Sequence, residues 1–238
     1  MKLLNRFLFL SAVLFFCNCL RAQTNNSTIE NALLIAERNK SKLDNTEQLL
    51  VVYNYQPESY SAFFVALEKK EKKWVVKYDP VAVGIGKNGF AMPLNKQEGD
   101  GKSPTGIFRL GKLYTYEKQV HTLLENQVTT KEDKWIDDPN SDDYNTYVRG
   151  PTTAKSYENL LLNTGAYKYC MVIEYNTNPI IKGKGSAIFF HLKGKAPYFT
   201  AGCVAIDEEN MKLIVNWLNP KLNPTIIMGN FSVLNSGL

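Results

Sequence analysis

Two side chains suited to covalent catalysis lie close together near the end of the sequence. His191 is the last residue but one of the apolar stretch SAIFFHL (186–192), and Cys203 follows it twelve residues later, directly after Thr200-Ala201-Gly202. A cysteine attacks as its thiolate, and a histidine within hydrogen-bond reach has the right pKa to take the thiol proton. Gly202 allows a positive φ or a close approach of substrate, and the N–H groups of Gly202 and Cys203 are candidate oxyanion donors. The spacing indicates a Cys–His pair for acyl transfer.

The alternative is a purely structural role for the same residues. Free cysteines are commonly buried and inert, and a histidine at a strand end can be satisfied by its neighbours. Cys170, flanked by Tyr169 and Met171, is predicted to be such a core residue. The few histidines and cysteines lack the short ligand spacing of a structural zinc site, so no metal or other cofactor is expected.

Residues 1–22 have the pattern of a secretory signal peptide. Lys2 and Arg6 precede an apolar run from Phe7 to Phe16, and Ala22 ends the polar stretch after it. The run is about half the roughly 20 residues that span a bilayer, so cleavage after Ala22 is favoured over a membrane anchor. Lipidation of Cys17 or Cys19 is disfavoured because small residues do not precede them. We expect an exported protein of the periplasm or cell envelope, without a stable membrane span.

Removal of that signal changes the composition. It takes three basic residues and no acids, which lowers the formal net charge from +5 to +2. No basic run with interleaved aromatic residues remains, so a nucleic-acid partner is not expected. It also takes two of the four cysteines, which leaves too few for a disulfide scaffold.

The rest of the chain alternates short apolar segments with turns. After a polar stretch, a short helix capped by Ser27 is expected on the surface, and a second helix is expected from Asp207 to Leu218. The charged residues 69–73 are expected to form a hairpin turn, and residues 117–165 a functional loop or surface excursion. The predicted strands are Gln48 to Asn54, Ala62 to Glu68, Trp74 to Val83, Lys168 to Tyr175, Ser186 to Leu192 and Pro224 to Gly229. The prediction is a mostly β (α+β) chain with a few peripheral helices.

Several motifs in order resemble the L,D-transpeptidase (YkuD-like) catalytic domain family. His191 followed by the Thr200–Val204 turn is similar to the family's His and [Ser/Thr]-x-Gly-Cys signature. The upstream EGDGKSPTGIF (98–108) is similar to its GDG-x-[ST]-P-x-G hairpin, and WIDDPNSDDYN (135–145), Ser156-x-Glu158-x-Leu160 and GKGSAIF (183–189) look like a branch of small exported members. The resemblance covers about residues 80–229 and implies an L,D-transpeptidase-like β-sandwich or β-rich single domain. Residues 48–238 are assigned to it, with residues 23–47 as an N-terminal segment.

The resemblance implies an activity on peptidoglycan stem peptides. Cys203 would attack the carbonyl before the terminal D-alanine of a tetrapeptide stem, and His191, oriented by the carbonyl of Leu192, would move the proton. An amine from a second stem would resolve the thioester into a cross-link between third-position residues, and water would give carboxypeptidase activity instead. Many members carry Arg two residues after the cysteine, where this chain and others of its branch differ. Ala205 stands there, which leaves the usual substrate contact open.

By the same resemblance, Thr200, Gly202 and the loop at 135–145 are expected to line the substrate groove. Trp135, Asp138, Tyr144 and Asn145 have the types to contact a zwitterionic stem, because carboxylates pair with an ammonium and aromatic rings cover peptide. Equally, DPNSDD is a set of good turn formers, and the aromatic residues then only anchor the loop.

Two other functions remain open from the sequence, and a third is disfavoured. A stem-peptide hydrolase would use the same pair, and a silent cell-wall binding module would share the fold without the chemistry. A papain-like protease is disfavoured because the cysteine follows the histidine and no third polar partner appears in the expected place. The oligomeric state is not predicted.

Overall fold

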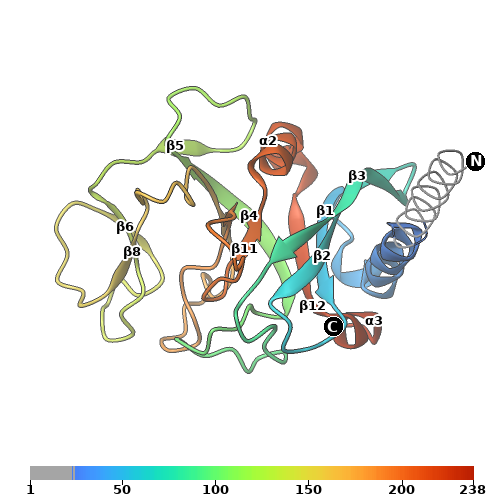
Figure 1. Cartoon of the computed structure of the whole chain (residues 1–238), viewed down its shortest axis with the longest axis horizontal. Helices are drawn as coiled ribbons and strands as arrows, with labels where there is room; N and C mark the ends of the chain where they lie inside the picture. Colours follow the sequence, from blue (N-terminus) through green and yellow to red (C-terminus); the bar gives the residue numbers. More distant parts are fainter. Residues whose placement is uncertain (1–22, 24) are drawn as a thin grey trace, which may run out of the picture.

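The computed structural model describes residue 23 and residues 25–238. The expected signal peptide, residues 1–22, lies outside these described residues. The fold is mostly β with a few peripheral helices, as the sequence predicted (Figure 1). None of the helices within the described part is long and apolar enough to cross a membrane.

A closed sheet forms the main body of the described chain. Its strands are β1 (Gln48–Asn54), β2 (Ser61–Lys70), β3 (Lys73–Gly84), β4 (Gly106–Thr115), β5 (Asn126–Val128), β9 (Tyr169–Ile173), β10 (Phe189–Leu192), β11 (Val204–Ile206) and β12 (Thr225–Asn230). In the described residues they follow the order β12-β1-β2-β3-β11-β10-β9-β4-β5, and β12 pairs with β4 as well. That extra pairing closes the run from β12 to β4 into a barrel-like ring.

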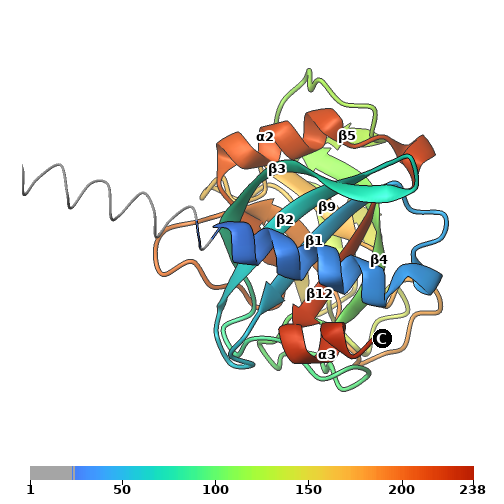
Figure 2. The same cartoon turned by 90° about the vertical axis from the view of Figure 1, so that its right-hand side faces the viewer.

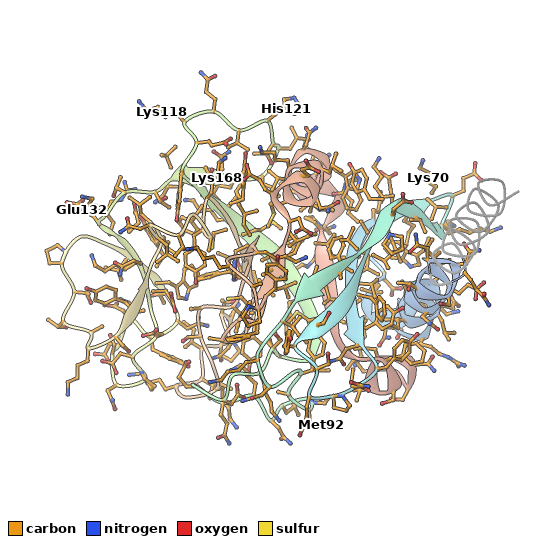
Figure 3. All side chains as sticks on the ribbon, in the orientation of Figure 1. Lys70, Met92, Lys118, His121, Glu132 and Lys168 are labelled. Carbon is orange, nitrogen blue, oxygen red and sulfur yellow. The ribbon has the colours of Figure 1, made fainter. Side chains whose placement is uncertain are left out.

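The expected β2–β3 hairpin is present. Its turn residues Glu71 and Lys72 have φ of 48° and 65°, the signature of a turn whose twist matches that of the strands. Lys70, labelled in Figure 3, lies at this tip. The hairpin continues to Gly84, where β3 meets β11.

Helices cover the outside of the ring. The N-terminal helix, residues 25–38, lies across β1 and β2 (Figure 2), and buries Ala32, Ile35 and Ala36 against residues of β1. It already includes residues 25 and 26, so Ser27 is not its N-cap as predicted. On another side, α2 (Glu208–Trp217) buries Met211, Ile214 and Val215 in the main core. Short elements η1 (Lys40–Lys42), η2 (Pro220–Leu222) and α3 (Phe231–Asn235) complete this shell.

A small sheet occupies the segment predicted as a long loop. It consists of β6 (Asp133–Ile136), β7 (Tyr147–Arg149) and β8 (Tyr157–Asn159), with β6 in the centre. Figure 3 labels Glu132 just before β6, at the far end of the molecule from Lys70. The prediction of a functional loop or surface excursion therefore missed these strands, because strands of three or four residues are too short to show an alternating pattern.

Asp133 anchors this small sheet through a buried carboxylate. Its side chain is fully buried, and it accepts hydrogen bonds from Arg149 Nε at 2.8 Å and Nη2 at 3.1 Å, and from Tyr147 and Gln127. Burial alone would raise the pKa of this carboxyl, but the hydrogen bonds from Arg149, Tyr147 and Thr130 outweigh it and lower the pKa well below its usual range. The folded state therefore favours the charged form.

We expect Asp133→Asn to lower the midpoint of thermal unfolding at pH 7 by roughly 5 °C, because charge-assisted hydrogen bonds to a buried group are lost. The folded-state pKa is depressed, so this stabilisation is present above about pH 4 and is lost as the pH falls below it. The difference in unfolding midpoint between Asp133→Asn and wild type should shrink as the pH falls below about 4. Asp142→Asn, which removes an exposed ion pair with Lys182, is the control and should leave the midpoint unchanged.

Candidate active site

Parallel strands bring the predicted catalytic residues together. His191 lies on β10 and pairs in register with Ala205 of β11, and Cys203 directly precedes β11. Both side chains line a cavity of about 350 Å³ on this side of the ring. Cys203 is 7% exposed and His191 8% exposed, so each is reached only through that cavity.

The Cys203 thiol rests between two backbone groups. Sγ accepts the Phe189 N–H at 3.3 Å, and the thiol donates to the Ala187 carbonyl at 3.3 Å. Burial raises the pKa of Cys203 to about 12, and the Phe189 N–H offsets only part of this. At neutral pH the Cys203 side chain is therefore an uncharged thiol.

The His191 ring is fixed by its own strand. Nδ1 lies 2.8 Å from the Leu192 carbonyl, the contact that the sequence predicted. A carbonyl only accepts, so Nδ1 carries the proton and Nε2 is the basic nitrogen. The Tyr167 ring packs edge-on against the imidazole with centroids 5.1 Å apart. Burial lowers the pKa of His191 to about 4, so the ring is neutral and ready to accept a proton.

The turn before Cys203 is fixed by hydrogen bonds of the Thr200 hydroxyl and by close packing of Gly202 against Lys102. Thr200 Oγ1 accepts the Gly202 N–H at 3.1 Å and donates to the Cys203 carbonyl at 2.8 Å. A Cβ on Gly202 would lie 2.9 Å from the Lys102 carbonyl, so close approach of the chain requires glycine here. Thr200 and Gly202 both line the cavity.

Ser103 in the upstream hairpin reaches across to this turn. Its fully buried hydroxyl donates to the Gly202 carbonyl at 2.7 Å and accepts the Gly86 N–H at 2.9 Å. The sequence assigned this hairpin only turn chemistry. The structure adds that one of its side chains holds the segment carrying Cys203.

Three carboxylates form another wall of the cavity, contributed by Glu98, Asp137 and Glu158. Glu98 Oε2 accepts hydrogen bonds from Tyr144 at 2.5 Å and Ser186 at 2.6 Å. Asp137 Oδ1 is buried without a hydrogen-bond partner. Burial raises the pKa of Asp137 and of Glu158, with nearby carboxylates adding to the shift. A cationic group bound in the cavity would favour the charged form of these carboxyls.

The loop residues predicted to contact substrate lie behind this wall. Trp135, Asp138, Tyr144 and Asn145 are all buried, and none is among the residues that line the cavity. Tyr144 holds Glu98, and Asp138 accepts backbone N–H groups of Asn140 and Lys155.

Asn145 makes the most contacts of the four. Its Oδ1 accepts Trp135 Nε1–H at 2.9 Å and the N–H of Ala187 at 3.0 Å, and its amide donates to two carbonyls. Ala187 is the residue whose carbonyl receives the Cys203 thiol. Asn145 thereby supports the backbone segment that contacts the Cys203 thiol.

Among the described residues, the other histidine and the other cysteine are apart from the cavity lining. His121 is exposed on the loop after β4, near α2, where its ring contacts Asn216 (Figure 3). Cys170 is fully buried in the core, as predicted. Among the residues that the structure describes, no group of three or more His, Cys, Asp or Glu side chains could hold a metal ion.

Comparison with known proteins decides the family. The YkuD family model, which describes the L,D-transpeptidase catalytic domain, matches residues 59–227. This range includes His191 and the turn from Thr200 to Cys203. The chain belongs to this family. No curated protein matches the chain. A solved structure of the helical cell shape determining protein Pgp2 from Campylobacter jejuni is similar, with 12% identity and a TM-score of 0.38; the match covers 84% of this chain and 55% of that one.

Within this L,D-transpeptidase domain, the position two residues after the cysteine lies on the face of the sheet that carries Cys203 and His191. Ala205 is 2% exposed and pairs in register with His191, while its neighbours Val204 and Ile206 point into the main core, so its methyl group lies on the opposite face of β11. The cation that lines the cavity comes from elsewhere, because Lys96 is the lysine or arginine among the described lining residues. The sequence offered no signal for Lys96 or Glu98, since both lie in a segment that turn chemistry alone explained.

Proposed function

We propose that this member of the L,D-transpeptidase family is an exported cysteine-dependent acyltransferase that acts on peptidoglycan tetrapeptide stems. The observation that supports it most is the shared cavity of Cys203 and His191, with a neutral thiol and a neutral imidazole whose tautomer leaves Nε2 basic. A proton acceptor and a nucleophile facing one hollow are the minimum for acyl transfer. Export, and a site of action in the periplasm or cell envelope, belong to this proposal.

The reaction begins as Cys203 Sγ bonds to the carbonyl carbon before the terminal D-alanine. His191 Nε2 takes the thiol proton and returns it to the amine of D-alanine as the C–N bond breaks, which leaves a thioester on Cys203. The amine of a second stem then attacks this thioester, and His191 takes its proton and returns it to the departing thiol. Water in place of the amine gives carboxypeptidase activity.

The oxyanion of each tetrahedral intermediate needs N–H donors. The Gly202 N–H donates to Thr200 Oγ1 at 3.1 Å, so we assign the oxyanion contact to the Cys203 N–H. Thr200 then acts by holding the turn.

A positively charged part of the stem meets the carboxylate wall. We assign this contact to Glu98, Asp137 and Glu158, since these carboxylates line the cavity. Trp135, Asp138, Tyr144 and Asn145 are proposed to support that wall rather than to touch substrate.

The deciding experiment incubates the mature protein with tetrapeptide muropeptides and measures released D-alanine and new cross-links by mass spectrometry. Release by wild type and none by Cys203→Ala supports the proposal, and the ratio of cross-linked to trimmed product separates transpeptidase from carboxypeptidase. If no D-alanine is released while the protein still sediments with peptidoglycan, a non-catalytic binding module replaces the enzyme.

We expect Ser103→Ala to lower kcat for D-alanine release by about tenfold, with little change in KM, because the variant loses the hydrogen bonds that hold the Cys203 turn. Thr105→Val is the matched control, since Thr105 donates to Ala91 within the same hairpin and does not touch the turn. Equal losses in both variants would mean that the hairpin matters only as a whole.

A further inference from the structure

Lys96 is a buried cation that the proposed chemistry does not use. It is 4% exposed, lines the cavity with Cys203, and lies across Gly185, where a Cβ would come within 3.2 Å of Nζ. Removing a lysine ammonium from water costs free energy, so a buried lysine is expected to be paired with an anion or to bind a ligand.

The Lys96 ammonium is held in place by hydrogen bonds to the loop that follows it, residues 97–100. Nζ donates to Asp100 Oδ1 at 2.7 Å and to the Gln97 carbonyl at 2.7 Å. The Asp100 carboxylate is itself fixed, since it accepts the N–H groups of Gln97 and Lys102. Ser103, which follows Lys102, donates to the Gly202 carbonyl in the turn directly before Cys203. The charge is therefore preorganised relative to the nucleophile.

One donor of Lys96 is left for a ligand. A lysine ammonium carries three N–H groups, and the described residues provide two acceptors. The same cavity presents the carboxylates of Glu98, Asp137 and Glu158. A cation beside an acidic wall complements a group that carries both a carboxylate and an ammonium.

We propose that Lys96 is a specificity-determining residue that binds the side-chain carboxylate of the third stem residue, while the carboxylate wall takes the ammonium of the same zwitterionic end. This rests on the proposed function for the identity of the ligand. The preference for a free carboxylate then comes from a residue on the hairpin side of the cavity, and not from the strand that follows Cys203.

The first test measures binding of tetrapeptide stems by calorimetry in a Cys203→Ala background, which prevents turnover. One stem has a free side-chain carboxylate at the third residue, and the other carries a carboxamide there. We expect about tenfold tighter binding of the free acid, as for loss of one charge-assisted hydrogen bond, and no preference after Lys96→Met. Lys96→Arg should keep most of it. Equal binding of the two stems by the Cys203→Ala protein would overturn the proposal.

The second test needs no stem peptide. The rates at which iodoacetate and iodoacetamide alkylate Cys203 are compared at one pH, so that only the charge of the reagent differs. We expect the iodoacetate-to-iodoacetamide ratio to fall about threefold in Lys96→Met, because the cation that attracts the carboxylate reagent is gone. Lys182→Met, an exposed lysine paired with Asp142, is the control and should not change it.

Asp100→Asn separates binding from a structural ion pair. This substitution removes the carboxylate paired with Lys96 but keeps the Lys96 ammonium. If Lys96 binds carboxylates, the iodoacetate-to-iodoacetamide ratio should therefore stay the same or rise. A fall of about threefold in Asp100→Asn would overturn the proposal, and this readout can be made even if Lys96→Met unfolds. If wild type releases no D-alanine but the ratio responds to Lys96, the proposed function fails and the carboxylate site stands. If D-alanine is released without any carboxylate preference, the proposed function stands and the carboxylate site fails.

Discussion

Replacing Cys203 with alanine is expected to abolish D-alanine release, by about 10⁴-fold or more, because Cys203 carries the one thiol among the described residues that line the cavity. The family resemblance adds an independent readout, since members are acylated by carbapenems. The mature wild-type protein should gain the mass of one carbapenem, and Cys203→Ala should gain none. Intact-protein mass spectrometry measures both.

The second cysteine provides a matched control. Cys170 is fully buried in the same aromatic cluster as Cys203, yet it does not line the cavity. Cys170→Ala should therefore form the adduct as wild type does. An adduct of equal yield on Cys203→Ala, or no adduct on wild type, would contradict the assignment of Cys203 as nucleophile.

Local sequence patterns predicted much of the ring. β1 has the predicted bounds because its apolar residues run uninterrupted between polar turns. β4 was missed, since Gly106 and Gly111 interrupt a strand that follows a Gly- and Pro-rich hairpin. The pairing of β12 with both β1 and β4, which closes the ring, joins segments far apart in the chain and leaves no local signal.

The proximity of His191 and Cys203 could also be predicted from local sequence. His191 and Cys203 are close in sequence, and one parallel strand pair brings them to the same cavity. The rest of the cavity comes from distant segments, so its members could not be read from spacing. Glu98 and Glu158 are 60 residues apart in the sequence and meet only through the packing of the small sheet on the ring.

The loop at 135–145 shows why residue type alone was insufficient. Asn145 and Trp135 have side chains that could bind a peptide, but their polar atoms bond to each other. Tyr144 has the phenol expected of a substrate contact, but that phenol donates to Glu98. Whether a polar side chain points toward a ligand or toward its own backbone depends on the tertiary fold, which the turn formers of this loop do not encode.

His191→Gln is expected to lower kcat/KM for D-alanine release by about 10³-fold, because the neutral Cys203 thiol needs a base to become a nucleophile during attack. Alkylation by iodoacetamide, which depends on the thiolate already present, should change only a few-fold in the same variant. The contrast between the two rates identifies His191 as the proton acceptor, since a merely structural role would lower both together.

The pH profiles sharpen this test. Burial raises the pKa of Cys203 to about 12 and lowers that of His191 to about 4, so no ion pair exists at rest. Alkylation should rise about tenfold per pH unit between about pH 6 and 9, while kcat/KM stays nearly flat there. The depressed folded-state pKa of His191 means that its contribution to stability is present above about pH 6.5 and lost as the pH falls toward 4. Activity in acid must therefore be read beside an unfolding curve. A plateau in the alkylation rate below pH 7 would instead indicate a thiolate–imidazolium pair at rest. His191 would then have taken the Cys203 thiol proton before substrate binds.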